Sequence, residues 1–382
     1  MTQNEFSQGL FEDYQEIPDG RIIKNEFSPW HHPRKHLIRL EQWVHYINSY
    51  SKRILHDKKD FKYFSLPGDD LLDIRTIHEE FCLKKEIKMR FLGFNDHTSD
   101  ADREQNANLS LAEVRGLKYI DKASQYHDNN ILNINSKESL VYQRFKEFGD
   151  FDVINLDFCN SVTKHEPSKK DNNHYNFLSK IIQLQNHRDK PWLMFLTTRV
   201  GDGHVHPQTL EIFKRCFINN LSDDTFRNKA EQLLNIYDSD SLEESLLIDD
   251  KFRKIVSTSF FKWMLTYSLS LTPKTTIKVL DVMEYKVYPK STSPDMLSFA
   301  LIFTPHHDQI HDPIGLAKSF VAVEKFREPT IASYYIERVC SATDCDKYLK
   351  ERPDKKEIMT VRSIDLLKSA RFDTSSYREQ FP

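Results

Sequence analysis

The chain of 382 residues has only 9 glycines and 5 cysteines, and neither sign of charge is in clear excess. Its 54 Lys and Arg residues are nearly balanced by 57 Asp and Glu residues, which gives a formal net charge of -3. This balance excludes a general electrostatic attraction to nucleic acids or to anionic membranes. Any such binding would need a local basic patch.

Long apolar runs are also missing from the sequence. No stretch approaches the roughly 18 apolar residues that a membrane-spanning helix needs. The first residues, MTQNEFSQGLFEDYQE, are acidic and contain no apolar signal core. We therefore expect a cytoplasmic protein that does not contact a membrane.

The cysteines are odd in number and contain no Cys-x-x-Cys pair; they are Cys82, Cys159, Cys216, Cys340 and Cys345. This pattern predicts reduced thiols rather than a disulfide framework. Cys340 and Cys345 are close in sequence, but a zinc site would need a second pair of ligands, and no histidine is near. We expect no metal site.

The composition is that of a globular protein, with 39% hydrophobic and 12% aromatic residues. Apolar runs typical of strands alternate with segments of helical periodicity. The predicted strands are 61–66, 87–94, 130–134, 151–158 and 191–198, followed by a hairpin of 275–287 and 296–304. The predicted helices are 33–55, 71–81, 137–148 and 174–185, and the polar stretch 96–110 is predicted as a loop. This order predicts an α/β fold with a doubly wound, mostly parallel sheet and a C-terminal antiparallel hairpin.

We expect three parts along the chain. Residues 1–56 form a leader and a helix packed on the core. Residues 57–305 form a Rossmann-like domain with a helical insert at 207–271, and 306–382 form a helical C-terminal extension.

The segment 64–73, FSLPGDDLLD, follows the first predicted strand and is a candidate ligand loop. Ligands of open α/β sheets bind at the carboxyl ends of strands, and a glycine there lets the backbone approach a nucleotide-like ligand. The alternative is an ordinary turn in which Gly68 supplies a positive φ. The acidic side chains that follow it would then favour the helix start through its dipole.

A carboxylate closes the most apolar of the predicted strands, 151–158. Burying an ionised carboxylate is costly unless it is paired or bound to something. Asp157 is therefore the strongest single candidate for a functional residue. A metal-dependent hydrolase built on Asp69, Asp70, Asp73 and Asp157 is a weaker alternative, because a count of carboxylates alone does not indicate a metal site.

The order of five strand-helix units, a helical insert and a closing hairpin resembles that of class I S-adenosylmethionine-dependent methyltransferases, over about residues 33–305. In that family the first loop holds the methionine part of the cofactor, and residues after the second and third strands contact ribose and adenine. The end of the fourth strand faces the reacting centre. The resemblance implies a cofactor site of Pro67, Gly68, Asp69, Asn95, Asp96, Asn135 and Ser136, with catalytic positions at Asp157 and Asn160.

The chain departs from the family pattern in three places. The first loop has a single glycine, Asn95 precedes the acidic residue after the second strand, and the fourth strand ends in Leu-Asp-Phe-Cys-Asn. The loop Ser-Leu-Pro-Gly-Asp-Asp also resembles that of bacterial three-Cys-motif partner proteins, which implies a bacterial source and a phage-defence or mobile-element system. A catalytically inactive Rossmann-like partner or nucleic-acid-binding subunit of a defence complex is therefore the alternative function.

Cations and aromatic rings are interleaved in residues 30–43, WHHPRKHLIRLEQW. Such a mixture suits phosphate contacts and base stacking. It makes His32, Arg34, Lys35 and Arg39 candidate contacts to DNA or RNA. Alternatively, Trp43 belongs to the apolar face of the helix and the cations are solvated.

Overall fold

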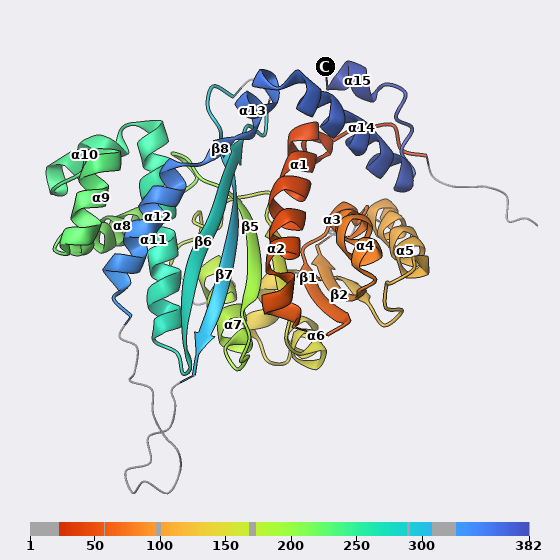
Figure 1. Cartoon of the computed structure of the whole chain (residues 1–382), viewed down its shortest axis with the longest axis horizontal. Helices are drawn as coiled ribbons and strands as arrows, with labels where there is room; N and C mark the ends of the chain where they lie inside the picture. The colour runs from red at the N-terminus through yellow and green to blue at the C-terminus, as the bar shows by residue number, and fades with distance from the viewer. Residues whose placement is uncertain are drawn as a thin grey trace, which may run out of the picture.

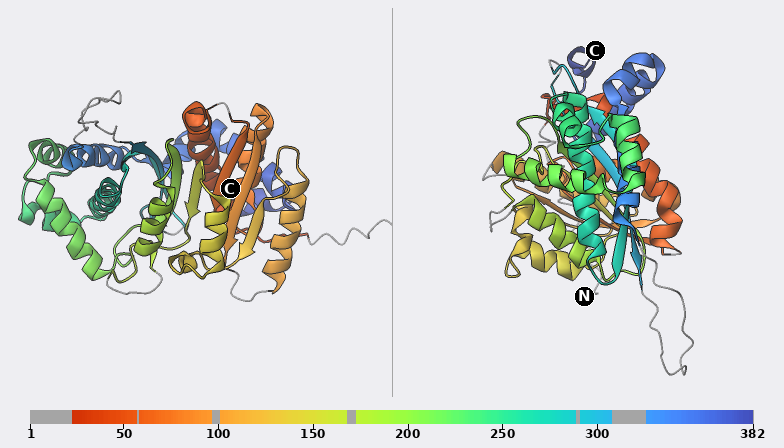
Figure 2. Two further views of the ribbon diagram at one scale, coloured as in Figure 1. Left: turned by 90° about the horizontal axis from the view of Figure 1, so that it is seen from below. Right: turned by 90° about the vertical axis from the view of Figure 1, so that its left-hand side faces the viewer.

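The computed structural model describes residues 23–56, 58–96, 101–167, 173–288, 291–307 and 326–381. Within these residues the strands form one eight-stranded sheet in the order β3-β2-β1-β4-β5-β7-β6-β8, flanked by helices (Figures 1 and 2). The strands are β1 (Asp60–Ser65), β2 (Lys88–Asn95), β3 (Gln125–Asp128), β4 (Val153–Asp157), β5 (Trp192–Arg199), β6 (Lys274–Tyr285), β7 (Met296–His306) and β8 (Thr343–Asp344).

The pairing confirms the predicted fold class. Strand β1 is parallel to β2 and β4, β2 is parallel to β3, and β4 is parallel to β5. Strand β7 is antiparallel to both β5 and β6, so the predicted hairpin enters the sheet. The short strand β8 is parallel to β6 and belongs to the C-terminal region.

Helices occupy both faces of the sheet. They are α1 (Pro33–Ile38), α2 (His45–Leu55), α3 (Leu72–Ile77), α4 (Leu83–Lys85), α5 (Ala101–Gly116), α6 (Leu140–Phe148), α7 (His174–Gln185), α8 (Pro207–Asn220), α9 (Asp224–Leu234), α10 (Ser239–Leu246), α11 (Asp249–Leu269), α12 (Glu328–Cys340), α13 (Cys345–Glu351), α14 (Pro353–Ser369) and α15 (Tyr377–Gln380). A π-helical segment, η2 (Arg39–Val44), joins α1 to α2 in one continuous rod, and another, η3 (His78–Cys82), joins α3 to α4.

Alternation of side chains along the strands divides the core in two. On β4, Val153 belongs to the buried cluster that includes residues of α1, α2 and α3, whereas Ile154 and Leu156 belong to the cluster that includes residues of α6, α7 and α11. On β5, Phe195 faces the first group and Met194 the second. Because successive strand residues point to opposite faces, these apolar runs mark strands that are covered on both sides.

Two predicted elements are wrong. Residues 130–134 are not the third strand: β3 is the polar edge segment Gln125–Asp128, and Ile131–Asn135 is a 3-10 helix. Its two isoleucines are three residues apart and both are buried, as the 3-10 repeat requires.

The predicted loop 96–110 is wrong over most of its length, because α5 begins at Ala101. The buried positions of α5 are Ala107, Ser110, Leu111 and Val114, which follow a helical repeat. Two of the four are small or polar, so the apolar face of this helix gives little signal in the sequence.

The C-terminal region returns to the start of the chain. Helices α14 and α15 lie beside the first turn of α1, at the end of the sheet where β1 leads into α3 (Figure 1). Helices α8, α9 and α10 form a lobe beyond the β6 side of the sheet (Figure 1). None of the described helices is both long and apolar enough to cross a membrane.

Candidate functional site

The carboxyl ends of β1, β2 and β4 lie on one edge of the sheet, because these strands are parallel and in register at Ser65, Gly93 and Asn155. The loop after β1 is held by a close contact. Pro67 is buried against Gly93 of β2, where an added Cβ would lie 2.9 Å from Pro67 Cγ. Pro67 therefore anchors the loop by packing.

Gly68 has a different environment from the one expected of a turn glycine. The positive φ of this loop belongs to Leu71, at 52°, and not to Gly68. Gly68 is exposed, and an added Cβ would meet no atom within 4 Å. The expected positive φ at Gly68 is thus wrong, although residues 68–71 do form a turn in which the Leu71 N–H donates to the Gly68 carbonyl oxygen over 3.0 Å.

Two of the predicted site residues meet at this edge. Asn95 Nδ2 donates to Asp69 Oδ1 over 2.9 Å, and Arg103 Nε donates to Asp69 Oδ2 over 2.8 Å. Arg103 comes from α5, the helix that the sequence did not reveal. Burial raises the pKa of Tyr126 on β3, and a hydrogen bond with Asn95 opposes that rise. Asp96 is exposed and accepts from Asn130 Nδ2 over 3.1 Å.

Asn135 and Ser136 do not follow a strand, so the premise on which the adenine contact was assigned to them is wrong. Asn135 donates to the carbonyl oxygen of Leu132, and Ser136 donates to Glu138, so both bonds are local. The residue that follows β3 is Asn129. Its backbone N–H donates to the Asn95 carbonyl oxygen over 2.9 Å.

Asp157 ends β4 and forms an ion pair with the leader helix. Lys35 Nζ lies 2.5 Å from Asp157 Oδ1 and 3.4 Å from the Tyr285 hydroxyl. The Lys35 side chain is 2% exposed, whereas that of Asp157 is 27% exposed. Burial lowers the pKa of Lys35, and Asp157 opposes this shift. Asn160, further along, is exposed, and its carbonyl oxygen accepts from Thr198 Oγ1.

The leader cations are not a surface patch. Arg34, Lys35 and Arg39 are 4%, 2% and 5% exposed. Arg34 Nη1 lies 2.6 Å from Asp346 Oδ1, and burial lowers the pKa of His32 to about 3. The exposed basic surface on which the predicted DNA or RNA contact depended is therefore absent from this helix.

Instead, the leader helix presents a buried polar stripe to the sheet, formed by Lys35, Arg39 and Gln42. Gln42 Nε2 donates to Asp281 Oδ2 over 3.1 Å and to the Ser298 carbonyl oxygen over 3.0 Å. Spacings of four and three residues place such side chains on one side of a helix. That spacing is the signal in the sequence that groups these three residues on one side of the helix.

A second buried carboxylate lies beside the edge. Asp73 Oδ2 accepts from the Tyr63 hydroxyl over 2.8 Å and also from Ser65 Oγ. Asn155 Nδ2 donates to the same Tyr63 hydroxyl over 2.9 Å. Burial raises the pKa of Asp73, and its two hydroxyl donors oppose that rise. This network joins α3 to β1 and β4.

The two ends of the described chain clasp each other over this region. The Tyr377 hydroxyl donates to the His31 carbonyl oxygen over 2.6 Å, and Phe27 and Tyr377 meet edge to face with ring centroids 5.1 Å apart. Asp70, at the start of α3, is paired with Lys24 and accepts from Asn106 Nδ2.

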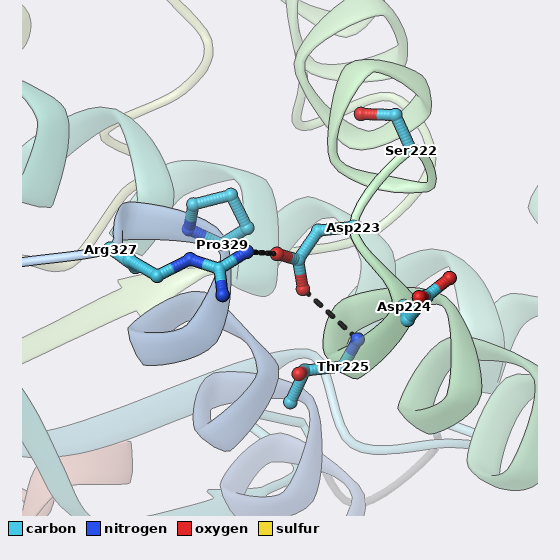
Figure 3. A pocket seen from close by; sticks show the side chains of 6 residues that line it. All are labelled: Ser222, Asp223, Asp224, Thr225, Arg327 and Pro329. Carbon is cyan, nitrogen blue, oxygen red and sulfur yellow. Dashed lines mark hydrogen bonds and ion pairs between the residues drawn. The ribbon is translucent and has the colours of Figure 1, made fainter.

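A pocket of about 450 Å³ lies away from this edge, between α9 and the start of α12 (Figure 3). It is lined by Ser222, Asp223, Asp224, Thr225, Arg327 and Pro329. Asp223 caps α9 by accepting from the Thr225 backbone, and Arg327 Nη2 lies 2.6 Å from its other oxygen. The pair Asp223–Arg327 therefore joins the start of α9 to the start of α12. Among the described residues, no group of three or more His, Cys, Asp or Glu could hold a metal ion.

No curated protein matches the chain. A solved structure from Listeria monocytogenes, provisionally described as a class I S-adenosylmethionine-dependent methyltransferase, is 11% identical and has a TM-score of 0.34, covering 83% of this chain and 80% of its own. That score is too low to carry an argument, so the fold assignment depends on strand order and register. The family model named PP_RS20740-like matches residues 24–381, and the chain belongs to this family.

Proposed function

We propose that this chain is a divergent class I methyltransferase-like protein that binds S-adenosylmethionine at the carboxyl edge of its sheet. The observation that carries the proposal is the sheet itself. Its order, β3-β2-β1-β4-β5-β7-β6 with β7 antiparallel, is the arrangement expected for that family, and it brings Asp69, Asn95 and Asp157 to one edge. Ligands of doubly wound sheets bind where the strand order reverses, which here lies between β1 and β4.

The residues at this edge fit the chemistry of the cofactor. The exposed backbone at Gly68 borders open space, which suits close approach of a ligand. The hydroxyls of a ribose are donors, and Asp96 and Asn95 offer a carboxylate and an amide oxygen where the diol is expected. We assign Gly68 and Asp69 to the amino-acid part. When bound, S-adenosylmethionine supplies an electrophilic methyl group on sulfur.

Asp157 is proposed to orient the methyl acceptor. Its described contacts use Oδ1, which leaves Oδ2 to accept a hydrogen bond from an N–H or O–H group. The buried ammonium of Lys35 fixes the carboxylate in place. Catalysis would then come mostly from holding the acceptor in line with the methyl group, with Asp157 as the residue that sets its direction. Asn160 is exposed beyond β4 and is proposed to face the acceptor as well.

Calorimetric titration with S-adenosylhomocysteine tests the proposal. We expect binding by the unaltered protein, and a loss of about tenfold in affinity for Asp96→Asn, because a charged acceptor of the ribose is lost. Asp224→Asn, an exposed carboxylate of α9, is the matched control and should bind normally. A folded protein that releases no heat with either S-adenosylmethionine or S-adenosylhomocysteine would contradict the proposal.

A second function is favoured by the internal pairing of the edge. Asp69, Asp70 and Asp157 are already paired with Arg103, Lys24 and Lys35, as in a sheet edge that no longer binds a cofactor. In that case the chain would serve as a non-catalytic partner or nucleic-acid-binding subunit of a bacterial defence complex. A cytoplasmic location and a bacterial phage-defence setting belong to both proposals. Phage plating on bacteria that express the chain or its Asp157→Asn variant tests that setting.

A further inference from the structure

Arg39 is a buried guanidinium whose hydrogen bonds are incomplete. Arg39 is 5% exposed. Among the described residues, Nη2 donates to the Trp30 carbonyl oxygen over 3.2 Å, and Nε has no partner. A guanidinium carries five N–H donors, and a buried cation is costly unless it is paired and hydrogen-bonded.

The other buried cations of this helix have carboxylate partners, although Arg34 Nε and both ring nitrogens of His36 also lack a hydrogen-bond partner. Lys35 Nζ lies 2.5 Å from Asp157, Arg34 Nη1 lies 2.6 Å from Asp346, and Gln42 bonds to two acceptors. Arg39 lies between Lys35 and Gln42 on the same stripe. Among the described residues, Arg39 is therefore the buried basic side chain of α1 and η2, apart from the neutral His36, that forms no ion pair with a carboxylate.

Arg39 lies near the point where the strand order of the sheet reverses. Its segment η2 packs on α3, and the charges of Asp157 and Asp73 oppose the lowering of its pKa by burial. The strand order reverses between β1 and β4, which is where ligands of doubly wound sheets bind. Arg39 is also the first residue of a π-helical segment, a rare form that is frequent at functional sites.

We propose that Arg39 binds an oxyanion, a carboxylate or phosphate group of a ligand that enters between the ends of β1 and β4. A planar guanidinium binds such groups through two parallel hydrogen bonds, and Lys35 adds a second positive charge beside it. The oxyanion has two sources. It belongs either to the amino-acid carboxylate of S-adenosylmethionine, in which case the inference rests on the proposed function, or to a separate anionic molecule.

Four proteins test this: the unaltered chain, Arg39→Met, Arg39→Lys and the control Arg34→Met, a cation equally buried but paired with Asp346. Each is titrated with inorganic phosphate at constant ionic strength, with S-adenosylhomocysteine, and with 5′-methylthioadenosine, which lacks the amino-acid part. We expect Arg39→Met to weaken binding of phosphate or S-adenosylhomocysteine about tenfold or more, since charged hydrogen bonds are lost. Arg39→Lys should weaken it less, and Arg34→Met should not.

The probes separate the two sources of the anion. A loss confined to S-adenosylhomocysteine, with 5′-methylthioadenosine unchanged, assigns the carboxylate of the cofactor, and a loss confined to phosphate assigns a separate anion. Equal affinity of the unaltered chain and Arg39→Met for both phosphate and S-adenosylhomocysteine overturns the inference, as does binding of neither. If phosphate binds and S-adenosylhomocysteine does not, the proposed function is contradicted, and the titration with phosphate still tests the inference about Arg39. Should Arg39→Met not fold, an unchanged affinity in Arg39→Lys overturns the inference.

Discussion

We expect that removing Lys35 and removing Asp157 from their ion pair cost different amounts of unfolding free energy. Asp157→Asn leaves the Lys35 ammonium, 2% exposed, without its carboxylate. Removing one partner of a buried pair in this way costs about 3–5 kcal/mol. Lys35→Met leaves Asp157 instead, which is 27% exposed and can regain water, so we expect a cost of about 1–2 kcal/mol from the lost charged hydrogen bond. The double variant should be more stable than Asp157→Asn alone.

The pH dependence supplies an independent check. Burial lowers the pKa of Lys35, and the loss of Asp157 lowers it further. Between the native and the unfolded pKa of Lys35, the unfolded chain binds more protons than the native chain. The stability of Asp157→Asn therefore rises with pH relative to that of the unaltered protein. Urea unfolding followed by circular dichroism should show that the deficit in unfolding free energy becomes smaller as the pH rises from 7 toward the ordinary pKa of lysine. Equal costs for the two single variants, or a deficit that does not change with pH, would refute the reasoning.

Two further substitutions test other parts of the structure. Gly93→Ala would force a Cβ to within 2.9 Å of Pro67 Cγ, so we expect a loss of about 1–3 kcal/mol in unfolding free energy. The control is Gly116→Ala, where a Cβ meets no atom within 4 Å, and it should be neutral or stabilising. Burial lowers the pKa of His36 from 6.5 to about 3, so below pH 6.5 the unfolded chain takes up a proton that the native chain does not, and stability falls. His36→Phe should reduce this loss of unfolding free energy by up to about 1.4 kcal/mol per pH unit between pH 6 and pH 4, as measured by urea unfolding. The control is His187→Gln, which alters a side chain that is 67% exposed and should follow the unaltered protein.

The fold was predictable where a strand is covered on both faces. Strands β4 and β5 carry near-continuous apolar runs because helices pack on both sides of them. The prediction failed at β3, an edge strand whose residues are polar, and at α5, where Ala107 and Ser110 fill part of the buried face. No residue of β3 is buried, and half of the buried positions of α5 are small or polar, so large apolar residues give no clear periodicity in either place.

The candidate site was predictable only in part, for a physical reason. Asp157 was identifiable because a carboxylate at the end of a buried strand needs a partner. Its partner, Lys35, lies 122 residues earlier and was taken for a nucleic-acid contact. The spacing of Lys35, Arg39 and Gln42 places them on one side of the helix. Deciding whether that side is buried or solvated requires knowing that it packs on β4, β6 and β7, which no local pattern reveals.

The scarcity of glycine in the first loop has a structural explanation that bears on the proposed cofactor. In a glycine-rich loop, the missing side chains allow a ligand to approach the backbone. Here the closest approach is between Pro67 of the loop and Gly93 of β2, so a glycine is required on the neighbouring strand. Since Gly68 alone borders open space, contacts with a ligand must come largely from side chains at the edge. Recognition would therefore depend more on Asp69, Asn95 and Arg39 than on loop backbone.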